Sequence, residues 1–355
     1  MGKRKICKIV FVILSIFLCV AFYELFGICI AYKKQPEVSN TIKKETQNDS
    51  WNERSENMER AVIIEKNPEA LLQRVRLIRN AKEDIILSTF AFQSDESGKL
   101  ILGALHDAAD RGVHIRLLVD GMESWIDMEG NPYFYGLSSH ENVEIKLYNK
   151  ANPLKPWKMM GRMHDKYLIA DGKRYILGGR NTYNYFLGDF PGHKNYDRDV
   201  LVVCDEPEKA NSVNQLLEYF ETIWEQEDSG YFHDNKKLAN RKSVKNAVLE
   251  LQNGYQKYFE ENKERICDTD YTDETFETEK IVLVSNPIHT GPKEPVVWYQ
   301  LGELMKNAKE RVKIHTPYII CNDMMYNTWK EIAERVPDFS IMTNSVANNG
   351  NPFGS

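Results

Sequence analysis

The sequence predicts an α/β protein with a mixed, largely parallel sheet and helices on both faces, preceded by one transmembrane helix. Two observations favour the α/β fold: helix and strand patterns alternate after residue 61, and a helix-to-strand pattern near residue 77 recurs near residue 304. A third observation, a long apolar run near the N-terminus, predicts the transmembrane helix.

The N-terminal segment, residues 1–34, is expected to be a signal anchor. Its apolar run, from Ile9 to Tyr32, is interrupted only by Glu24 and is long enough to cross a bilayer. A removed signal peptide is disfavoured because no small-x-small cleavage site follows. A buried core helix is disfavoured because the run is apolar all round. Four cations before the run and two after it predict a cytoplasmic N-terminus with the globular part outside the membrane.

The composition disfavours one class of function. With 42% hydrophobic and 28% charged residues, the chain is ordinary for a globular protein. Net charge is −6, and residues 35–355 carry −11, from 40 Lys and Arg against 51 Asp and Glu. A non-specific nucleic-acid binder would need a basic surface, so nucleic acid is a disfavoured partner.

A polar stretch, residues 35–60, reads as a tether between the anchor and the first lobe, for which we expect residues 61–225. Pro68 opens the first helix of this lobe, which has apolar residues on one face. A strand, a second helix that ends at Gly112, and another strand follow.

A repeat predicts a second lobe. Residues 77–92, "LIRNAKEDIILSTFAF", align without gaps on residues 304–319, "LMKNAKERVKIHTPYI". The alternative is that helix-to-strand junctions simply resemble one another. We expect residues 281–355 to begin a second, incomplete lobe, and the charged and acidic residues 226–280 to be a helical inter-lobe connection.

The cysteines predict no metal or disulfide framework. Three belong to the N-terminal segment, and Cys204, Cys267 and Cys321 are widely spaced and odd in number. One disulfide among these three is left open. No metal-ligand cluster, nucleotide-binding loop or flavin fingerprint is found, so we expect no cofactor.

A candidate site lies in residues 161–181, "GRMHDKYLIADGKRYILGGRN". Asp171 and Gly172 between two apolar runs predict a hairpin turn, and His164 and Lys166 should share one strand face. An imidazole there can attack phosphorus while the ammonium binds the non-bridging oxygens.

Two glycines, Gly178 and Gly179, would let the backbone approach a ligand, and Asn181 can donate its amide to phosphate. Each residue of the site has a structural alternative. A lone histidine is often a satisfied structural residue, Lys166 could lie on a solvated face, and the turn alone explains Asp171. The pattern is specific only in combination.

In combination, these residues resemble a known family. His164-x-Lys166-x4-Asp171 followed by Gly178-Gly179-Arg180-Asn181 is similar to the HKD signature of the phospholipase D superfamily, and "LHDAADRGVHIRLLVDG" and "NYDRDVLVV" are similar to its cardiolipin synthase-like branch. The resemblance covers about residues 61–355.

The resemblance implies phospholipase D-like lobes and metal-independent chemistry. It makes His164 a covalent nucleophile, with phosphate held by Lys166, Asn181 and Gly179. Asp171 would be the third residue of the catalytic motif, supporting the hairpin and the imidazoles. Two further carboxylates, Asp197 and Asp199, are either acids behind the site or residues of a solvated edge.

One departure from the family pattern matters. Family members of this length carry two HKD motifs, and the second histidine protonates the leaving alcohol. Here 44 residues separate Asp120 from His164, and the same count from Asn344 passes Ser355. His315 has no lysine two residues on. A further lobe or a dimer would have to supply the second motif.

The sequence therefore predicts a membrane-anchored phosphodiesterase or phosphatidyltransferase that acts on membrane phospholipids through a phosphohistidine. Two alternatives stay open. One is an anchored nuclease of the same superfamily, and the other is a non-catalytic remnant that lacks the second motif.

Overall fold

The computed structural model describes residues 2–48, 59–204, 206, 212–233 and 235–345. Part of the expected tether (49–58) and the end of the expected second lobe (346–355) lie outside the described residues. The chain forms two compact units, residues 1–33 with 54–283 and residues 34–53 with 284–355. Each unit is described by itself.

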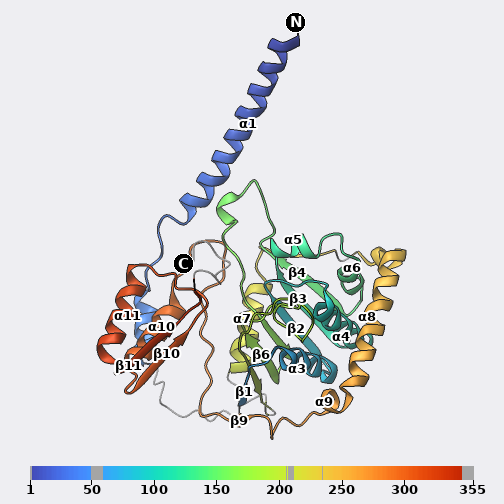
Figure 1. Cartoon of the computed structure of the whole chain (residues 1–355), viewed down its shortest axis with the longest axis vertical. Coiled ribbons are helices and arrows are strands. Elements are labelled where there is room, and N and C mark those ends of the chain that lie inside the picture. Colours follow the sequence, from blue (N-terminus) through green and yellow to red (C-terminus); the bar gives the residue numbers. More distant parts are fainter. Residues whose placement is uncertain (1, 49–58, 205, 207–211, 234, 346–355) are drawn as a thin grey trace. The chain divides into compact units, whose positions relative to one another are not determined.

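Unit 1 is built on a nine-stranded mixed sheet with helices on its faces, the α/β class that was predicted, although parallel pairing is confined to three of the strands (Figure 1). The strand order is β8-β4-β3-β2-β5-β6-β7-β1-β9. Strands β2, β3 and β4 are parallel to one another, and every other neighbouring pair is antiparallel. The strands are β1 (Arg60–Ile64), β2 (Asp84–Thr89), β3 (His114–Asp120), β4 (Val143–Tyr148), β5 (Tyr167–Ala170), β6 (Arg174–Gly178), β7 (Asp199–Val203), β8 (Ser229–Tyr231) and β9 (Phe276–Glu277).

Helices α3 and α4 cover one face of the sheet. Pro68 stands in the first turn of α3 (Asn67–Asn80), where its missing N–H costs nothing. Asp95 caps α4 (Glu96–Asp110) by accepting a 3.0 Å hydrogen bond from Gly98 N–H. Both helices bury their apolar stripes in the core cluster that also contains alternate residues of β2 and β3.

Helix α7 (Ser212–Trp224) covers the opposite face of the sheet. Alternation along β3 turns Arg116 away from the α3 side, and its guanidinium stands 4.9 Å from the Phe220 ring of α7. Tyr175 of β6 and Ser212 share a hydrogen bond of 2.9 Å. The site-bearing strands β5 and β6 are therefore held in the middle of a sheet covered on both faces.

Residues 226–280, expected to be an inter-lobe connection, instead complete unit 1. They supply the terminal strands β8 and β9, and the helices α8 (Lys242–Glu261) and α9 (Lys263–Cys267). Helix α8 packs on α4 and on α6 (Pro132–Ser138). The apolar spacing of α8 explains this, because Val244, Ala247, Leu251, Tyr255 and Phe259 form one buried stripe.

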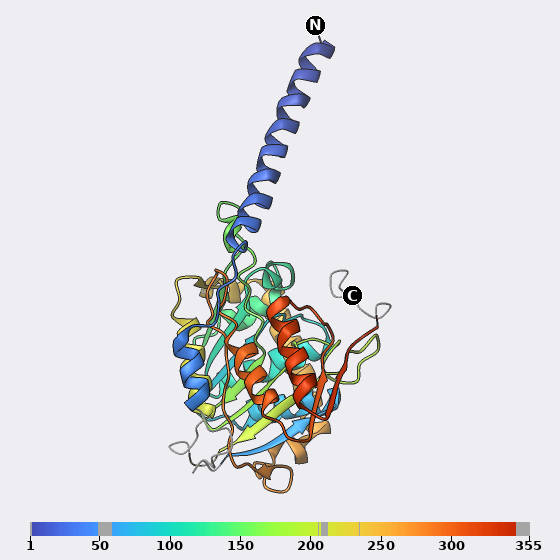
Figure 2. The ribbon, with the colours of Figure 1, turned by 90° about the vertical axis from the view of Figure 1, so that its left-hand side faces the viewer.

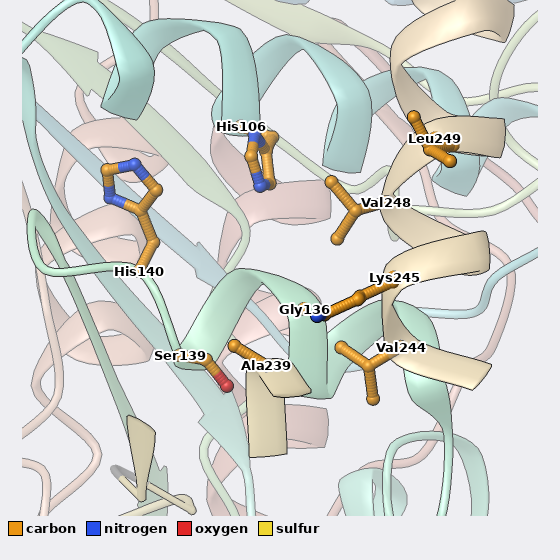
Figure 3. A pocket seen from close by; sticks show the side chains of 9 residues that line it. All are labelled: His106, Gly136, Ser139, His140, Ala239, Val244, Lys245, Val248 and Leu249. Carbon is orange, nitrogen blue, oxygen red and sulfur yellow. The ribbon is translucent and has the colours of Figure 1, made fainter. Parts of the chain in front are cut away.

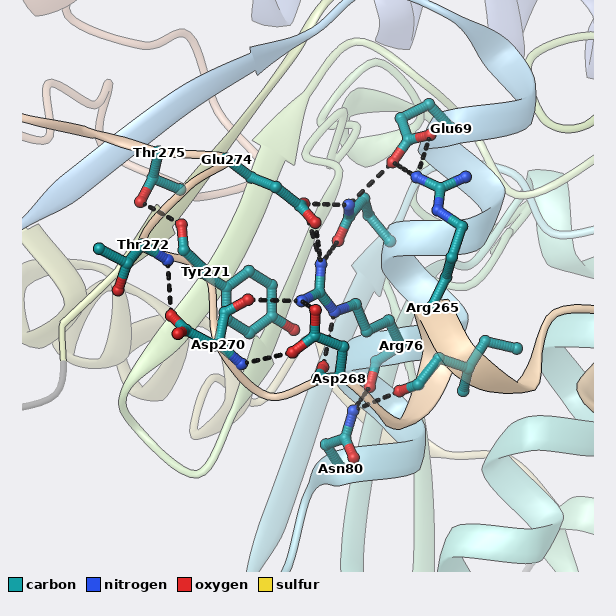
Figure 4. A network of polar contacts seen from close by, with 12 residues as sticks. Glu69, Arg76, Asn80, Arg265, Asp268, Asp270, Tyr271, Thr272, Glu274 and Thr275 are labelled. Atoms are coloured by element: carbon teal, nitrogen blue, oxygen red, sulfur yellow. Dashed lines mark hydrogen bonds and ion pairs between the residues drawn. The ribbon is translucent and has the colours of Figure 1, made fainter.

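A polar network fastens the end of this segment to α3 (Figure 4). Arg76 is buried and donates hydrogen bonds to Glu274, at 2.9 and 3.0 Å, and to the carbonyl groups of Asp268 and Asp270. The Arg76 guanidinium also lies 3.9 Å from the centroid of the Tyr271 ring. One arginine thus joins a helix near the start of the lobe to a loop about two hundred residues later.

Unit 2 repeats the opening of unit 1. Helix α10 (Val296–Lys306), strand β10 (Arg311–His315), helix α11 (Asp323–Arg335) and strand β11 (Asp338–Met342) follow in order, and β10 and β11 are parallel. The same helix-strand-helix-strand order, with parallel strands, opens unit 1, and β10 starts at the residue that the sequence alignment pairs with the start of β2. This is the order of elements that the repeat predicted, and the assignment of residues 281–355 to a second lobe stays a prediction. Within the expected tether, residues 40–48 form helix α2 (Asn40–Asn48).

Helix α1 (Gly2–Ala31) corresponds to the expected anchor. Its apolar part, Lys8–Ala31, has 24 residues, and most of their side chains are exposed. In the described part of the chain, it is the one helix that is long and apolar enough to cross a membrane.

Candidate active site

The topology of the sheet brings the predicted site residues to one edge. Because β2, β3 and β4 are parallel, their carboxyl ends meet at the same edge. Strand β5 runs antiparallel to β2, so Tyr167 at its start pairs with Ser88 near the end of β2. Residues just before β5 and just after β6 therefore also lie at this edge. These are the positions of His164, Lys166 and Asn181.

The nucleophile candidate and its lysine lie next to one another. His164 and Lys166 stand in the extended segment before β5 rather than inside the strand. Lys166 Nζ donates a 2.7 Å hydrogen bond to the backbone carbonyl of His164. The Phe90 ring contacts both residues, at 4.6 Å from the His164 ring and 5.2 Å from Lys166 Nζ. The edge contact with Phe90 thus orients the imidazole of His164, and the Lys166 ammonium makes a cation–π contact with the same ring.

Asp120, at the end of β3, positions the chain that leads into His164. Its Oδ2 accepts a 3.1 Å hydrogen bond from Met163 N–H, and its carboxylate pairs with Arg162. Oδ1 also accepts backbone N–H groups of the turn after β3, from Met122 and Glu123. This buried carboxylate fixes the residue before the histidine at the carboxyl end of β3.

Asn181 reaches the same place from the other side. Its Oδ1 accepts a 3.3 Å hydrogen bond from Ala91 N–H, next to Phe90. This contact fixes the amide plane, so the Nδ2 donor is directed away from that backbone. A bridge between Phe92 and Thr182 holds the two segments together. His164, Lys166 and Asn181 thus all contact the pair Phe90 and Ala91.

The environment favours a neutral histidine and a lysine that loses its proton easily. Desolvation by neighbouring groups, with the Lys166 charge adding to it, lowers the pKa of His164 to about 4. His164 is nevertheless exposed to solvent, and an imidazole is mostly neutral at pH 7 even at its ordinary pKa. Burial lowers the pKa of Lys166 to about 8, against the opposing charges of Asp165 and Asp197.

Asp171 does not join the site. It lies at the far end of β5 from His164, in the hairpin turn that the sequence predicted, with a φ of 53°. Its carboxylate accepts backbone hydrogen bonds from Lys82 at 3.0 Å, Glu83 at 2.8 Å and Asp84 at 3.1 Å. Seven residues of extended chain separate it from His164 by about 20 Å. The expectation that Asp171 supports the imidazole of this lobe is therefore wrong; it supports the hairpin.

The two glycines make room for carboxylates, not for a ligand. A Cβ on Gly179 would overlap the Asp197 carboxylate, and one on Gly178 would overlap Asp199. Gly179 N–H is directed to the Arg198 carbonyl at 3.4 Å. The expectation that Gly179 binds phosphate is therefore not supported by the geometry, because its space and its donor are both used within the protein.

Of the two carboxylates, Asp199 is not part of a solvated edge. It is fully buried and pairs with Arg74 at 2.9 Å and Arg180 at 3.2 Å. Arg180 also donates to the carbonyl groups of Ile64 and Glu65. This cluster joins β1, α3 and β7 beneath the segment that carries Asn181. Asp197 is partly exposed, and its negative charge raises the pKa of Lys166, against the lowering by burial.

A separate hollow of about 420 Å³ lies between α4, α6 and α8 (Figure 3). It is lined mainly by apolar groups, with His106 and His140 at one side. Asp110 contacts both rings, at 3.1 and 3.2 Å. None of the residues that line this hollow belongs to the group around His164. Among the residues that the structure describes, no cluster of three or more His, Cys, Asp or Glu is placed to hold a metal ion.

Comparison with known proteins agrees with this geometry. A family model described as "Cardiolipin synthase, PLD-like domain" matches residues 74–224, from within α3 to the end of α7. Residues 74–224 are a phospholipase D-like domain of the cardiolipin synthase branch. The HKD signature at His164 and Lys166 lies inside this domain, at the carboxyl edge of its parallel strands.

The phospholipase D-like domain is shared with several relatives. An uncharacterized protein of Helicobacter pylori is 28% identical over 316 residues, 81% of this chain and 59% of the relative. Cardiolipin synthase C of Escherichia coli is 30% identical over 154 residues, 39% of this chain and 31% of the relative. The chain thus spans less than two thirds of the length of either. The structure of phosphatidylserine synthase from Haemophilus influenzae is similar over 86% of this chain and 66% of that one, at 16% identity and a TM-score of 0.54. That likeness concerns the fold.

Sequence reasoning missed two residues of this site. Phe90 was only part of an apolar strand pattern, and nothing in the sequence says that its ring would contact both His164 and Lys166. Asp120 closes a strand at the carboxyl edge, and that position is a usable signal for a role at the site. Its partners, Arg162 and Met163, are distant in sequence and follow only from the sheet order.

Proposed function

We propose that this protein is a membrane-anchored phosphodiesterase or phosphatidyltransferase that acts on phospholipids through a phosphohistidine at His164. The supporting observation is the convergence of three groups on Phe90 and Ala91: a neutral imidazole, a buried ammonium and an oriented amide. The first is a nucleophile, and the other two are donors for phosphate oxygens. Membership of the phospholipase D superfamily supports the same class of reaction.

The reaction has two steps. A ring nitrogen of His164 attacks the phosphorus of a phosphodiester, the bond from phosphorus to the leaving oxygen breaks, and the phosphatidyl group stays on the histidine. The leaving alkoxide then needs a proton, for which a second histidine from a further lobe is the proposed donor. In the second step, water or an alcohol attacks the phosphohistidine and gives its proton to that second histidine, and the bond from phosphorus to His164 breaks.

Lys166 and Asn181 act on the phosphate in both steps. The ammonium balances the negative charge that the non-bridging oxygens gain as the bond to His164 forms. The Asn181 amide adds a neutral donor whose direction is fixed by Ala91. The Phe90 ring shields one side of His164 and of Lys166 from water.

The anchor places this chemistry where its substrate is. A span of the length of α1 would keep the domain at the membrane surface, and a lipid confined to the bilayer would need no attractive charge on the protein. We further propose that the N-terminus is cytoplasmic and the domain lies outside the membrane, because the cations before Ile9 outnumber those after Tyr32.

The test is covalent labelling of the protein completed with a second HKD motif. Phospholipid labelled in its phosphatidyl part should leave acid-labile, hydroxylamine-sensitive label on the protein. His164→Asn should abolish the label and turnover, while His193→Asn, at an exposed histidine of the same domain, should preserve both. Label or normal turnover in folded His164→Asn would refute the assignment. Normal folding of each variant is checked by circular dichroism.

A further inference from the structure

Large apolar side chains are exposed at the same sheet edge as His164. The turn after β3 forms the short helix α5 (Glu123–Asp127), where Trp125 is 67% exposed and Ile126 is 73% exposed. The loop after β4 carries Leu154, 77% exposed, and Met160, 59% exposed. Large apolar side chains are rarely exposed close together on the surface of a soluble protein, so these residues indicate a contact with a partner.

The loop after β4 contacts the apolar helix α1, and this contact indicates the kind of partner that the exposed residues have. Tyr23 Oη of α1 donates a 2.8 Å hydrogen bond to the carbonyl of Leu154. Gly27, one helical turn later, packs so closely on Pro156 that an added Cβ would lie 2.5 Å from its Cγ. Both views of the ribbon show the loop beside the end of α1 (Figures 1 and 2).

The position of this contact along α1 gives its depth. At 1.5 Å per residue, Gly27 lies about 6 Å and Tyr23 about 12 Å before Ala31, where the apolar span ends. The whole span is about 36 Å long, against a hydrocarbon core of about 30 Å. When α1 crosses a bilayer, the loop that touches Tyr23 and Gly27 must therefore lie at the headgroup level or just below it.

The composition of the loop fits that depth. Trp157, beside Pro156, is the residue type that gathers at membrane interfaces. Residues 149–163 contain four Lys or Arg and no acidic residue, in a chain whose part after residue 34 is strongly acidic. Lys155 is exposed beside Leu154. Apolar tips with flanking cations suit a surface of acyl chains and anionic headgroups.

We propose that these five residues form a membrane-docking surface: Trp125, Ile126, Leu154, Trp157 and Met160. It inserts into the leaflet that α1 leaves at Ala31, so that the sheet edge with His164 faces the phosphates of that leaflet. This inference rests on the proposed function only in taking α1 as a membrane helix. The docking surface explains how a lobe with an acidic surface approaches lipid phosphate: the basic loop and the apolar tips make the contact.

The test uses the full chain reconstituted in nanodiscs of phosphatidylethanolamine and phosphatidylglycerol brominated on the acyl chain. Bromine quenches tryptophan fluorescence only at contact range. Trp157 is uninformative because it belongs to the loop that already contacts α1, whereas Trp125 belongs to a different segment. Trp125→Phe should remove part of the quenched emission. Trp224→Phe, at a buried core tryptophan, should leave the quenched emission unchanged.

An unchanged quenched emission in Trp125→Phe would overturn the docking surface and point instead to a protein partner for α5. The substitution is at an exposed site, so loss of folding is not expected, and near-ultraviolet circular dichroism checks it. Failure here is distinguishable from failure of the proposed function. Quenching needs no turnover, and an inactive chain with a quenched Trp125 would retain the surface while losing the enzyme assignment.

Discussion

The Lys166 ammonium is hydrogen-bonded, at 2.7 Å, to the backbone carbonyl of His164. The residue that would bind phosphate is therefore tied to the main chain of the residue that would attack it. The bond uses one of the three N–H donors of the ammonium. Any shift of the segment before β5 moves both groups together.

Replacing the lysine should damage chemistry and not folding. Lys166→Met keeps an unbranched chain on the Phe90 ring but removes the charge. We expect the rate of phosphohistidine formation in the completed protein to fall by a factor of 100 or more, on the order of 3 kcal/mol. Lys173→Met, in the turn at the other end of the same hairpin, is the control and should keep the parent rate. If Lys166→Met lowered the rate of phosphohistidine formation no more than Lys173→Met does, Lys166 would have no role in phosphate binding.

The histidine should stay reactive in unusually acidic solution. Because desolvation and the Lys166 charge lower the pKa of His164 to about 4, the folded protein holds the ring neutral between pH 4 and pH 6.5, where an ordinary histidine takes up a proton. Modification of His164 by diethylpyrocarbonate, followed by mass spectrometry, should have its midpoint near pH 4 in the folded chain. In urea the midpoint should return to about 6.5. Coincident midpoints would contradict the assigned environment.

The same shift predicts how acid affects stability. A proton binds the unfolded histidine more tightly than the folded one, so the contribution of His164 to stability is present above pH 6.5 and is lost as pH falls toward 4. Replacement by Asn should remove this part of the acid dependence of urea unfolding. Unchanged acid dependence in His164→Asn would argue against a desolvated ring.

Asp171 should matter for stability alone. Asp171→Ala removes the acceptor of three backbone N–H groups at the start of β2, and we expect a loss of about 2 kcal/mol in the free energy of unfolding. Lys82→Ala, at an exposed neighbour, should change it by less than about 0.5 kcal/mol. The measurement is urea unfolding of the full chain in detergent. Loss of histidine labelling in Asp171→Ala at parental stability would place the residue in the chemistry after all.

Breaking the buried charge cluster of Asp199, Arg74 and Arg180 should lower the free energy of unfolding more than Asp171→Ala does. Asp199→Asn leaves Arg74 and Arg180 without their shared carboxylate, which predicts a loss of about 3–5 kcal/mol. Glu277→Gln removes the partner of Arg60 in an ion pair whose acidic side chain is 90% exposed, so it should have almost no effect. Similar values for the two variants would mean that the cluster is not isolated from water.

The topology of the anchor can be checked in cells. Protease added to intact spheroplasts should remove the domain beyond residue 35, because the cations before Ile9 favour a cytoplasmic N-terminus. A domain that is protected until the membrane is broken would reverse the orientation. A chain found without residues 1–34 would show that the segment is removed.

The sequence was sufficient for the α/β class, the hairpin at Asp171 and the repeat at residue 304, because these depend on local apolar spacing and on turn residues. It was sufficient too for the meeting of His164 with Lys166, which are two residues apart. The sequence could not predict that the Phe90 ring contacts His164 and Lys166, because this contact depends on the pairing of β5 with β2.

Other features could not be read locally because two properties of one segment compete. The charges of residues 226–280 suggested a solvated connection, yet the apolar stripe of α8 decides its position on α4 and α6. Similarly, glycines at Gly178 and Gly179 suggest closeness to a ligand, whereas the strand that follows supplies two carboxylates that occupy the space. A glycine in the sequence indicates that another group approaches the backbone closely, but the sequence does not indicate which group it is.

The strand order also bears on how the chain acquires its structure during synthesis. Arg60 at the start of β1 pairs with Val203 in β7, and β2 meets its neighbour β5 only after two further strands have been made. Pairings so distant in sequence pay their loop-closure entropy before they gain any contact, so they form slowly. A ribosome therefore leaves β1 without β7, and β2 without β5, for several seconds or more, at elongation rates of about 5–20 residues per second. The edge that carries His164 forms only once β5 has been made and has paired with β2, and β9, made later still, completes the sheet beside β1.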